Sequence, residues 1–336
     1  MASALLRSGW FWLAAGAVAS LLVLIAFILY GTMVPGRSHR GTMPPLSDEE
    51  RIVSAELRAH VSLLAVETAD RNVFLHGTLE AAADYVRSAF ASMGYTVEEQ
   101  NFTAQEKSVR NLSVEIRGSS LPEEIVIFGA HYDAVAGCPG ANDNASGVAA
   151  LLALARHAKS QNFSRTVRFV AFVNEEPPFF QTAEMGSLVY ARAARQRGEK
   201  IVAMLSLETI GYYSDAPGSQ QYPAPFGMLY PETGNFITFV ANYKSRALLH
   251  RVISAFRENT QFPSEGAAAP EWIPGIGWSD HWAFWKEGYP AVMVTDTALF
   301  RYPHYHTSRD TPDKLDYDRM ARVVSGLSHV LRALAK

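Results

Sequence analysis

Residues 124–133 read EIVIFGAHYD, and this stretch decides the fold class. Its apolar residues are consecutive rather than alternating, which predicts a strand buried on both faces, as in a sheet covered by helices on both sides. Polar residues begin directly where that strand ends, at His131 and Asp133. In open α/β sheets, sites form at the carboxyl ends of the strands. The stretch therefore predicts an α/β fold and also the sheet edge at which chemistry is expected.

Strand-like and helix-like segments alternate on both sides of this stretch. Strands are expected at 95–102, 111–117, 124–130, 166–173, 201–208 and 291–295, and helices at 48–65, 77–93, 145–159, 184–196, 244–257 and 316–335. We therefore predict one α/β domain, a three-layer α/β/α sandwich with a mixed, mostly parallel central sheet. The segments 214–235 and 259–279 are rich in Gly, Pro and Ala and are expected to be long loops, which are often functional.

The composition of the 336-residue chain is that of a globular protein, with 48% hydrophobic and 19% charged residues. It excludes disordered, collagen-like and coiled-coil classes. A net charge of -3 offers no basic stripe for nucleic acid, so no nucleic-acid partner is expected. The single cysteine, Cys138, excludes an intramolecular disulfide framework and any CxxC metal site. A transition metal would have to be bound by His, Asp and Glu.

The N-terminal region contains no charge between Arg7 and Arg37, and residues 10–30 are almost entirely apolar. A helix of about 20 residues spans the hydrocarbon core of a bilayer, so we predict a membrane anchor over 1–33. A cleaved signal peptide is the alternative. Basic residues flank both sides and do not decide orientation. We expect the catalytic part on the extracytoplasmic side, because an N-terminal anchor resembles an export signal.

Three prolines and two glycines within 34–47 predict a linker after the anchor. The folded domain is then expected over 48–336. Its start is marked by Ser47, because the sequence SDEE resembles the N-terminus of a helix.

Two motifs at strand ends carry candidate chemistry. His131 and Asp133 lie two residues apart on an extended chain and so point to the same side. This suits a metal-bound imidazole whose other nitrogen is held by a carboxylate, although a surface histidine near a turn would look the same. Glu175 and Glu176 follow the strand at 166–173. Adjacent carboxylates there repel each other and lose solvation unless a cation lies nearby. Because neighbours face opposite ways, one can bind metal while the other handles protons.

Three more polar positions fall at the same sheet edge. Asp143 lies 12 residues after His131, Glu208 ends the strand at 201–208, and His306 follows the last predicted strand. Alone, each has an ordinary explanation: a helix cap, an exposed strand-end acid and a packed ring. Together they form a set of oxygen and imidazole ligands, which suits zinc or a similar divalent ion. One shared carboxylate suits a two-metal site, whose ions lie about 3.5–4 Å apart.

The order and spacing of these motifs resemble metallopeptidase family 28, the co-catalytic zinc aminopeptidases. That family also holds glutamate carboxypeptidase-like enzymes, and the glutaminyl cyclases are close relatives. The resemblance covers roughly residues 75 to 335. Its specific parts are HYD at 131–133, GANDNASG at 140–147, NEE at 174–176, LE at 207–208, SDH at 279–281 and YHTxxD at 305–310.

The resemblance implies two zinc ions per chain. It implies that Asp143 bridges the ions, that His131 and Glu208 complete one site, and that Glu176 and His306 complete the other. The fold it implies is that of the zinc peptidases. The substrate it implies is a peptide with a free N-terminus.

The resemblance also implies roles for residues that do not bind metal. Glu175 is the general base that activates the shared water and returns the proton to the leaving amine. Tyr305 donates a hydrogen bond to the tetrahedral oxyanion. Asp133 and Asp280 are carboxylates that support the metal ligands. Cys138, close to the metal loop, is incidental because N and O donors fill every ligand position.

One position departs from the simple aminopeptidases, which most often have Asp where this chain has Glu208. A longer side chain changes how the metal and the free substrate amine are held, so it weakens the aminopeptidase assignment and not the hydrolase assignment. A one-zinc glutaminyl cyclase and a carboxypeptidase or dipeptidase on the same fold stay open. A receptor or scaffold that lost the chemistry is disfavoured, because no ligand is missing. The candidate walls of a specificity pocket are 212–235 and 259–279, with Tyr212, Tyr213, Phe226, Trp272 and Trp278.

Overall fold

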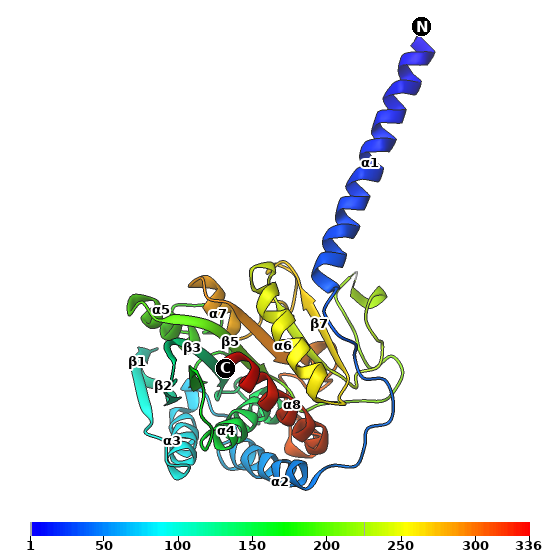
Figure 1. Ribbon diagram of the computed structural model, residues 1–336. Coiled ribbons are helices and arrows are strands. Elements are labelled where there is room, and N and C mark those ends of the chain that lie inside the picture. The colour runs from blue at the N-terminus through cyan, green and yellow to red at the C-terminus, as the bar shows by residue number, and fades with distance from the viewer. Residues whose placement is uncertain (1, 225) are drawn as a thin grey trace.

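The computed structural model describes residues 2–224 and 226–336 (Figure 1). The helices are α1 Ala2–Thr32, α2 Asp48–Ser62, α3 His76–Ser92, α4 Gly147–Ala158, α5 Gly186–Gln196, α6 Arg246–Asn259, α7 His281–Lys286 and α8 Tyr317–Ala335. The strands are β1 Glu98–Ala104, β2 Lys107–Ile116, β3 Leu121–His131, β4 Arg165–Phe172, β5 Lys200–Glu208, β6 Ile237–Ala241, β7 Ser264–Ala268 and β8 Ala291–Thr295.

The strands form one mixed sheet in the order β1-β2-β4-β3-β5-β8-β6-β7. Its centre is parallel: β4, β3, β5 and β8 run side by side in the same direction. Antiparallel pairing joins β2 to β4 and β6 to β8 on either side of that centre. The carboxyl ends of four neighbouring strands therefore meet at one edge of the sheet, which is where α/β folds place ligands.

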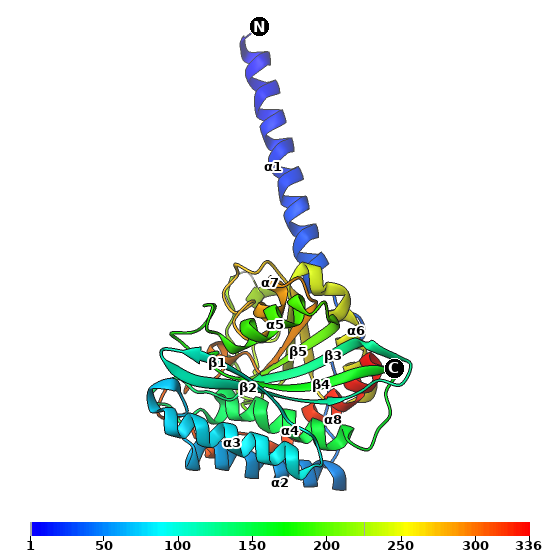
Figure 2. The ribbon, with the colours of Figure 1, turned by 90° about the vertical axis from the view of Figure 1, so that its left-hand side faces the viewer.

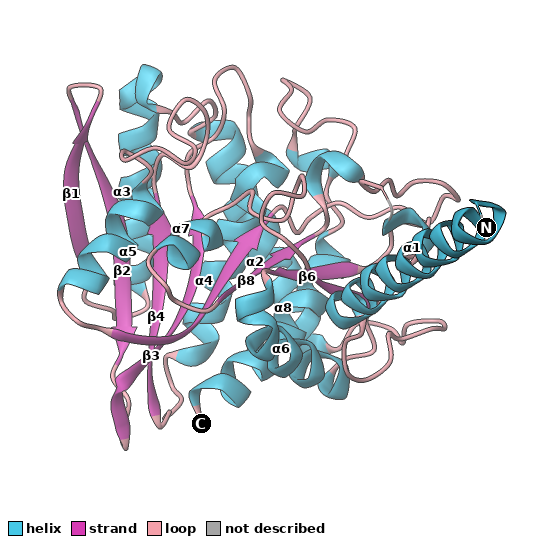
Figure 3. Cartoon of the chain, turned by 90° about the horizontal axis from the view of Figure 1, so that it is seen from above, coloured by secondary structure: helices cyan, strands magenta, loops and turns pink. Residues whose placement is uncertain are grey.

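Helices cover both faces of the sheet, as Figures 2 and 3 show. On one face, α2, α3, α4 and α8 pack over the larger apolar core, and α6 packs against α8. Most of α4 is buried because its sequence GVAALLALARHA is apolar around nearly the whole helix. The other face carries the short helices α5 and α7 and a smaller apolar cluster. The predicted three-layer α/β/α architecture with a mixed, mostly parallel sheet is confirmed.

Two strands differ from the sequence prediction. β7 at Ser264–Ala268 lies inside the segment 259–279 that was expected to be a loop, and β6 at Ile237–Ala241 was not expected at all. β7 carries Gly and Ala, which have low strand propensity. Its extended form is supported by parallel pairing with β6. Local sequence misses such strands because their stabilising partner is distant in the chain.

The N-terminal helix α1 projects away from the sheet domain (Figure 1). Its segment Trp12–Thr32 is long and apolar enough to cross a membrane, judged by length and composition. A signal sequence would have the same properties. The domain boundaries stay a prediction: an anchor over 1–33, a linker over 34–47 and a folded domain over 48–336.

Candidate metal centre

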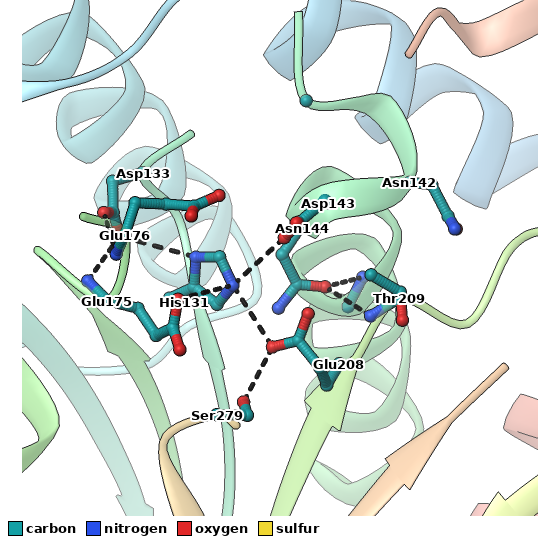
Figure 4. Close-up of polar contacts among 12 residues, drawn as sticks. His131, Asp133, Asn142, Asp143, Asn144, Glu175, Glu176, Glu208, Thr209 and Ser279 are labelled. Atoms are coloured by element: carbon teal, nitrogen blue, oxygen red, sulfur yellow. Dashed lines mark hydrogen bonds and ion pairs between the residues drawn. The ribbon is translucent and has the colours of Figure 1, made fainter. Parts of the chain in front are cut away.

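Three adjacent parallel strands deliver polar side chains to the same edge of the sheet (Figure 4). His131 is the last residue of β3 and Glu208 the last residue of β5, the strand hydrogen-bonded to it. Glu175 and Glu176 follow β4, which pairs with β3 on its other side. Parallel strands in register place their carboxyl ends together, so residues far apart in sequence become neighbours.

The first candidate ligand group joins His131, Asp143 and Glu208. The Nε2 atom of His131 lies 3.4 Å from Asp143 Oδ1 and 3.2 Å from Glu208 Oε2. All three residues are buried. Ser279 Oγ donates a hydrogen bond of 2.7 Å to Glu208 Oε2 and thereby orients that carboxylate.

The second candidate group joins Asp143, Glu176 and His306. His306 Nε2 lies 3.1 Å from Asp143 Oδ2 and 3.2 Å from Glu176 Oε2. Asp143 thus faces the two histidines with different oxygens, Oδ1 toward His131 and Oδ2 toward His306. A carboxylate shared in this way is the arrangement that two-metal sites require.

Several polar atoms of these two groups are buried without a hydrogen-bond partner. They are both ring nitrogens of His131, Nε2 of His306, Oδ1 of Asp143 and Oε1 of Glu176. Buried polar atoms are normally satisfied, because leaving one unpaired costs roughly 1–3 kcal/mol. A cation between these atoms would satisfy the histidine Nε2 atoms and the carboxylate oxygens at once. The donor set, imidazole nitrogen and carboxylate oxygen without thiolate, suits zinc and similar divalent ions.

The pKa shifts of the two histidines also favour a cation in this cluster. Burial by itself lowers the pKa of His131, yet the carboxylates of Glu208 and Glu175 raise that pKa well above its usual value. Burial also lowers the pKa of His306, but the carboxylates of Asp143 and Glu176, 3.1 and 3.2 Å from its Nε2 atom, raise it to about 10. Without metal, the surrounding carboxylates therefore favour the positively charged form of both imidazoles. A divalent cation would replace the protons that this form carries.

Glu175 lies beside both groups but belongs to neither. Its Oε2 atom is 3.8 Å from His131 Nε2. Burial raises the pKa of Glu175 well above its usual value, and the nearby carboxylates of Glu208 and Glu176 raise it further against the opposing effect of His131. A carboxylate that binds protons this readily is suited to general acid–base chemistry near neutral pH.

Asp133 and Asp280 have different surroundings. Asp133 Oδ1 lies 3.5 Å from His131 Nδ1. Its two oxygens also accept hydrogen bonds from the backbone N–H groups of Glu175 and Glu176, at 3.2 and 3.1 Å. One carboxylate thereby positions three side chains of the centre. Asp280 is fully buried with neither oxygen hydrogen-bonded, and burial raises its pKa to about 7.

Three supporting residues escaped the sequence analysis. Asp310 was seen only as part of the YHTxxD motif; its carboxylate accepts hydrogen bonds from the N–H groups of Asn142 and Asp143, at 2.8 and 3.1 Å. Ser279, in the SDH motif, holds Glu208. The fully buried Arg71 lies under the metal loop and donates to backbone carbonyls there, including that of Gly140 at 2.7 Å. Nothing in the sequence around Arg71 signals this role.

Tyr305 and Glu208 both line a cavity of about 100 Å³ that extends from the metal ligands. The Tyr305 ring stacks on the His306 ring, with 3.9 Å between centroids. The cavity walls are mostly apolar and include Phe236, Val240, Ile276 and Met293. Among the predicted specificity residues, Phe226 and Trp278 line the cavity, whereas Tyr212, Tyr213 and Trp272 are not among its lining residues.

Sequence comparison connects this geometry to known proteins. Residues 111–331 match the family model described as Peptidase family M28. The Escherichia coli (strain K12) protein YfbL, itself described as uncharacterized, is 40% identical over 75% of this chain and 80% of its own length. Leucine aminopeptidase 1 of Arthroderma otae is 28% identical over 63% of this chain, but the match spans only 55% of that protein.

Solved structures share the fold at low sequence identity. BSAP, a zinc aminopeptidase from Bacillus subtilis, matches with a TM-score of 0.68 at 14% identity, over 84% of this chain and 95% of that one. A glutaminyl cyclase from Fimbriiglobus ruber matches with a TM-score of 0.62 at 20% identity, over 90% of this chain and 99% of that one. The fold therefore accommodates both peptide hydrolysis and cyclisation, and only the site residues can distinguish them.

Proposed function

This chain belongs to peptidase family M28, the zinc metallopeptidases, and from that premise we propose that it is a dinuclear aminopeptidase anchored in a membrane by α1. One observation carries the proposal: the two carboxylate oxygens of Asp143 face two separate histidine–carboxylate pairs. A single-metal enzyme has no use for the second pair. Sequence similarity to leucine aminopeptidase 1 supports release of an N-terminal residue.

Five residues are proposed to hold two zinc ions. His131 and Glu208 would hold one, Glu176 and His306 the other, and Asp143 would bridge them. When bound, two such cations lower the pKa of a shared water and polarise the scissile carbonyl.

The remaining steps are proposed for this chain's own groups. Glu175 accepts a proton from the attacking water and delivers it to the leaving amine. Asp133 holds Glu175 in place through the backbone N–H. The hydroxyl of Tyr305, which lines the cavity together with Glu208, donates to the developing oxyanion. Burial raises the pKa of Tyr305, so its proton is retained and available as a donor.

The cavity beside Glu208 supports a preference for an apolar N-terminal side chain. Its walls are mostly apolar and include residues of β6 and β8 and the loop that carries Ile276, with Glu265 of β7 as a charged lining residue in addition to Glu208. Burying such a side chain is favourable by roughly 1.5–3 kcal/mol. Substrates beginning with Leu or Met are therefore expected to be hydrolysed faster than those beginning with Asp or Lys.

The test is metal stoichiometry combined with hydrolysis of aminoacyl chromogenic substrates by the full chain. We expect two metal ions per chain and release of the N-terminal residue that a chelator abolishes. Glu175→Gln should lower kcat by about 10²–10⁴-fold while both ions stay bound. Glu123→Gln is the matched control, because Glu123 is exposed near the start of β3, at the opposite end from His131. Full activity of the Glu175→Gln variant would refute the proposed base.

The competing proposal is a glutaminyl cyclase, favoured by the similar fold of the Fimbriiglobus ruber enzyme. Peptides that begin with Gln distinguish the two on the same sample. Loss of ammonia and formation of a pyroglutamyl end, with one metal ion per chain, would replace the aminopeptidase assignment. Release of free glutamine with two ions per chain would support it.

A further inference from the structure

The C-terminal turns of α1 are packed firmly on the sheet domain. Arg246 of α6 donates a hydrogen bond of 2.6 Å from Nε to the carbonyl of Tyr30, and its guanidinium lies 4.0 Å from the centre of the Tyr30 ring. The Phe27 ring lies 4.6 Å from the Tyr243 ring, centroid to centroid. Gly31 approaches β7 so closely that a side chain there would meet the carbonyl oxygen of Ala268.

The segment after α1 continues this contact along the outer strand β7. Arg257 Nη1 donates to the carbonyl of Pro35 at 2.9 Å. The backbone N–H of Ser264 donates to Ser38 Oγ at 2.9 Å. The region predicted as a linker is therefore held to the domain over its first part. As a result, α1 has a defined direction relative to the domain.

The domain turns a particular face toward α1. Figure 2 shows α5 and α7 on the side of the sheet from which α1 leaves, and α2, α3, α4 and α8 on the opposite side. The turn after Phe226 lies beside the base of α1 (Figure 1), where Tyr230 donates a 2.7 Å hydrogen bond to the carbonyl of Gly266 in β7. Trp272 belongs to the loop that leaves β7 directly after Ala268, the residue that touches Gly31.

Exposed apolar side chains occur on these two loops and on the turn at Ala298–Phe300. Met228 is 88% exposed and Trp272 is 82% exposed, more than any other large hydrophobic residue that the structure describes. Leu229, Trp278 and Leu299 are also exposed. We call these five residues the apolar rim. Two of the five, Trp278 and Leu299, also line the cavity beside Glu208.

The surroundings of the rim match the chemistry of a bilayer surface. Tyr30 lies in the last turns of the apolar helix, a position typical of rings at the membrane–water boundary. Two basic side chains lie near it: Arg246 of α6 contacts its ring, and Lys244, in the 3₁₀ turn directly before α6, is exposed. Tryptophan is enriched at that boundary, and basic residues favour anionic headgroups. A soluble partner would not explain why this surface adjoins the end of a membrane-length helix.

We propose that the apolar rim rests in the headgroup region of the phospholipid bilayer that α1 spans. The substrate cavity then opens at the membrane surface, and its preferred substrates are peptides whose N-termini lie close to that surface. This inference rests on the membrane anchor proposed above. It does not depend on which peptide bond is hydrolysed.

Spin-label accessibility tests the placement on the full chain in nanodiscs of phosphatidylcholine and phosphatidylglycerol. In a Cys138→Ser background, Met228→Cys and Trp272→Cys each carry a nitroxide. Ser92→Cys on α3, exposed on the opposite side, is the matched control. We expect the labels at 228 and 272 to be relaxed more by oxygen than by a nickel chelate, and the label at 92 to show the reverse.

Three outcomes are distinguishable. Labels at 228 and 272 that behave like the label at 92 would overturn the proposal. Dipolar coupling between labels on two chains would overturn it in favour of a second copy of this chain covering the rim. In a separate kinetic test, Met228→Ser should lower kcat/KM at least threefold for a peptide tethered to lipid and leave kcat/KM for a soluble peptide unchanged. Equal effects on the two peptides would overturn the proposed preference for substrates at the membrane surface. Since the label measurement needs no turnover, failure of the aminopeptidase proposal would not affect it.

Discussion

The two halves of the candidate metal centre differ in how they are built. The closed half, His131 and Glu208, stands on the ends of two neighbouring strands, and the His131 side chain is 0% exposed. The open half, Glu176 and His306, joins a strand end to a loop, and the His306 side chain is 30% exposed. Strands hold side chains more rigidly than loops do. The closed half is therefore the more rigid of the two candidate ligand groups, and the open half is the more accessible to solvent.

Removing what the halves share should have the largest effect. Asp143→Asn keeps the shape of the bridge but removes its charge and one acceptor oxygen, so neither half keeps its full ligand set. We expect the affinity for both metal ions to decrease and kcat/KM to fall on the order of 10⁴-fold or more. Metal content and kcat/KM, both measured on the same preparation of the variant, test this expectation. A variant that kept one tightly bound ion would show that the halves are independent.

Substituting each histidine in turn should show how much each half contributes to metal binding. His131→Ala and His306→Ala should each lower the affinity of their own half for zinc by at least about a hundredfold, more than the loss of a supporting residue. Added imidazole should restore activity only to the His306→Ala variant, because that position is open to solvent and His131 is fully buried. Equal rescue of the two variants would contradict the difference in access.

The pH dependence of metal binding should be visible in the open half. In the metal-free protein, the pKa of His306 is raised to about 10, so a metal must displace one proton from it throughout the neutral range. Burial raises the pKa of Glu176 to about 7, so a second proton is displaced below that pH. Affinity should thus rise about tenfold per pH unit from pH 7 to 8.5, and more steeply below pH 7.

Competition between the protein and a zinc-binding dye, measured from pH 6 to 8.5, checks this slope. The His306→Ala variant is the control, since its remaining slope should be lower by about one proton. If the affinity for zinc did not change with pH, His306 and Glu176 would carry no displaceable proton in the metal-free protein.

The smallest effect is expected from the residue that supports the closed half. Ser279→Ala removes the hydrogen bond to Glu208 Oε2 and should weaken zinc binding by about tenfold in that half alone. Thr307→Ala, an exposed neighbour of His306, is the matched change on the open side and should leave binding unchanged. Equal responses of the two variants would mean that the hydrogen bond from Ser279 contributes no rigidity.

Much of this centre is predictable from sequence because each ligand directly ends a strand or lies in a short motif. The apolar run before His131 and the run before Glu175 identify buried strands, and parallel order then places their ends together. β7 was missed because its extended form depends on pairing with β6. Arg71 was missed because three of its four side-chain hydrogen bonds reach backbone carbonyls more than 60 residues away, those of Tyr132, Pro139 and Gly140. No local pattern encodes either.

The sequence by itself determined the architecture, the family and the identity of the candidate ligands, because periodicity, apolar runs and short motifs are local properties of the chain. Only the tertiary structure decided that Asp143 faces two histidines with different oxygens. Only it showed that one half of the centre is closed and the other open. Only it placed the end of α1 against β7, beside the rim of the cavity. Such features depend on distances between residues far apart in the chain, which packing sets and local sequence does not.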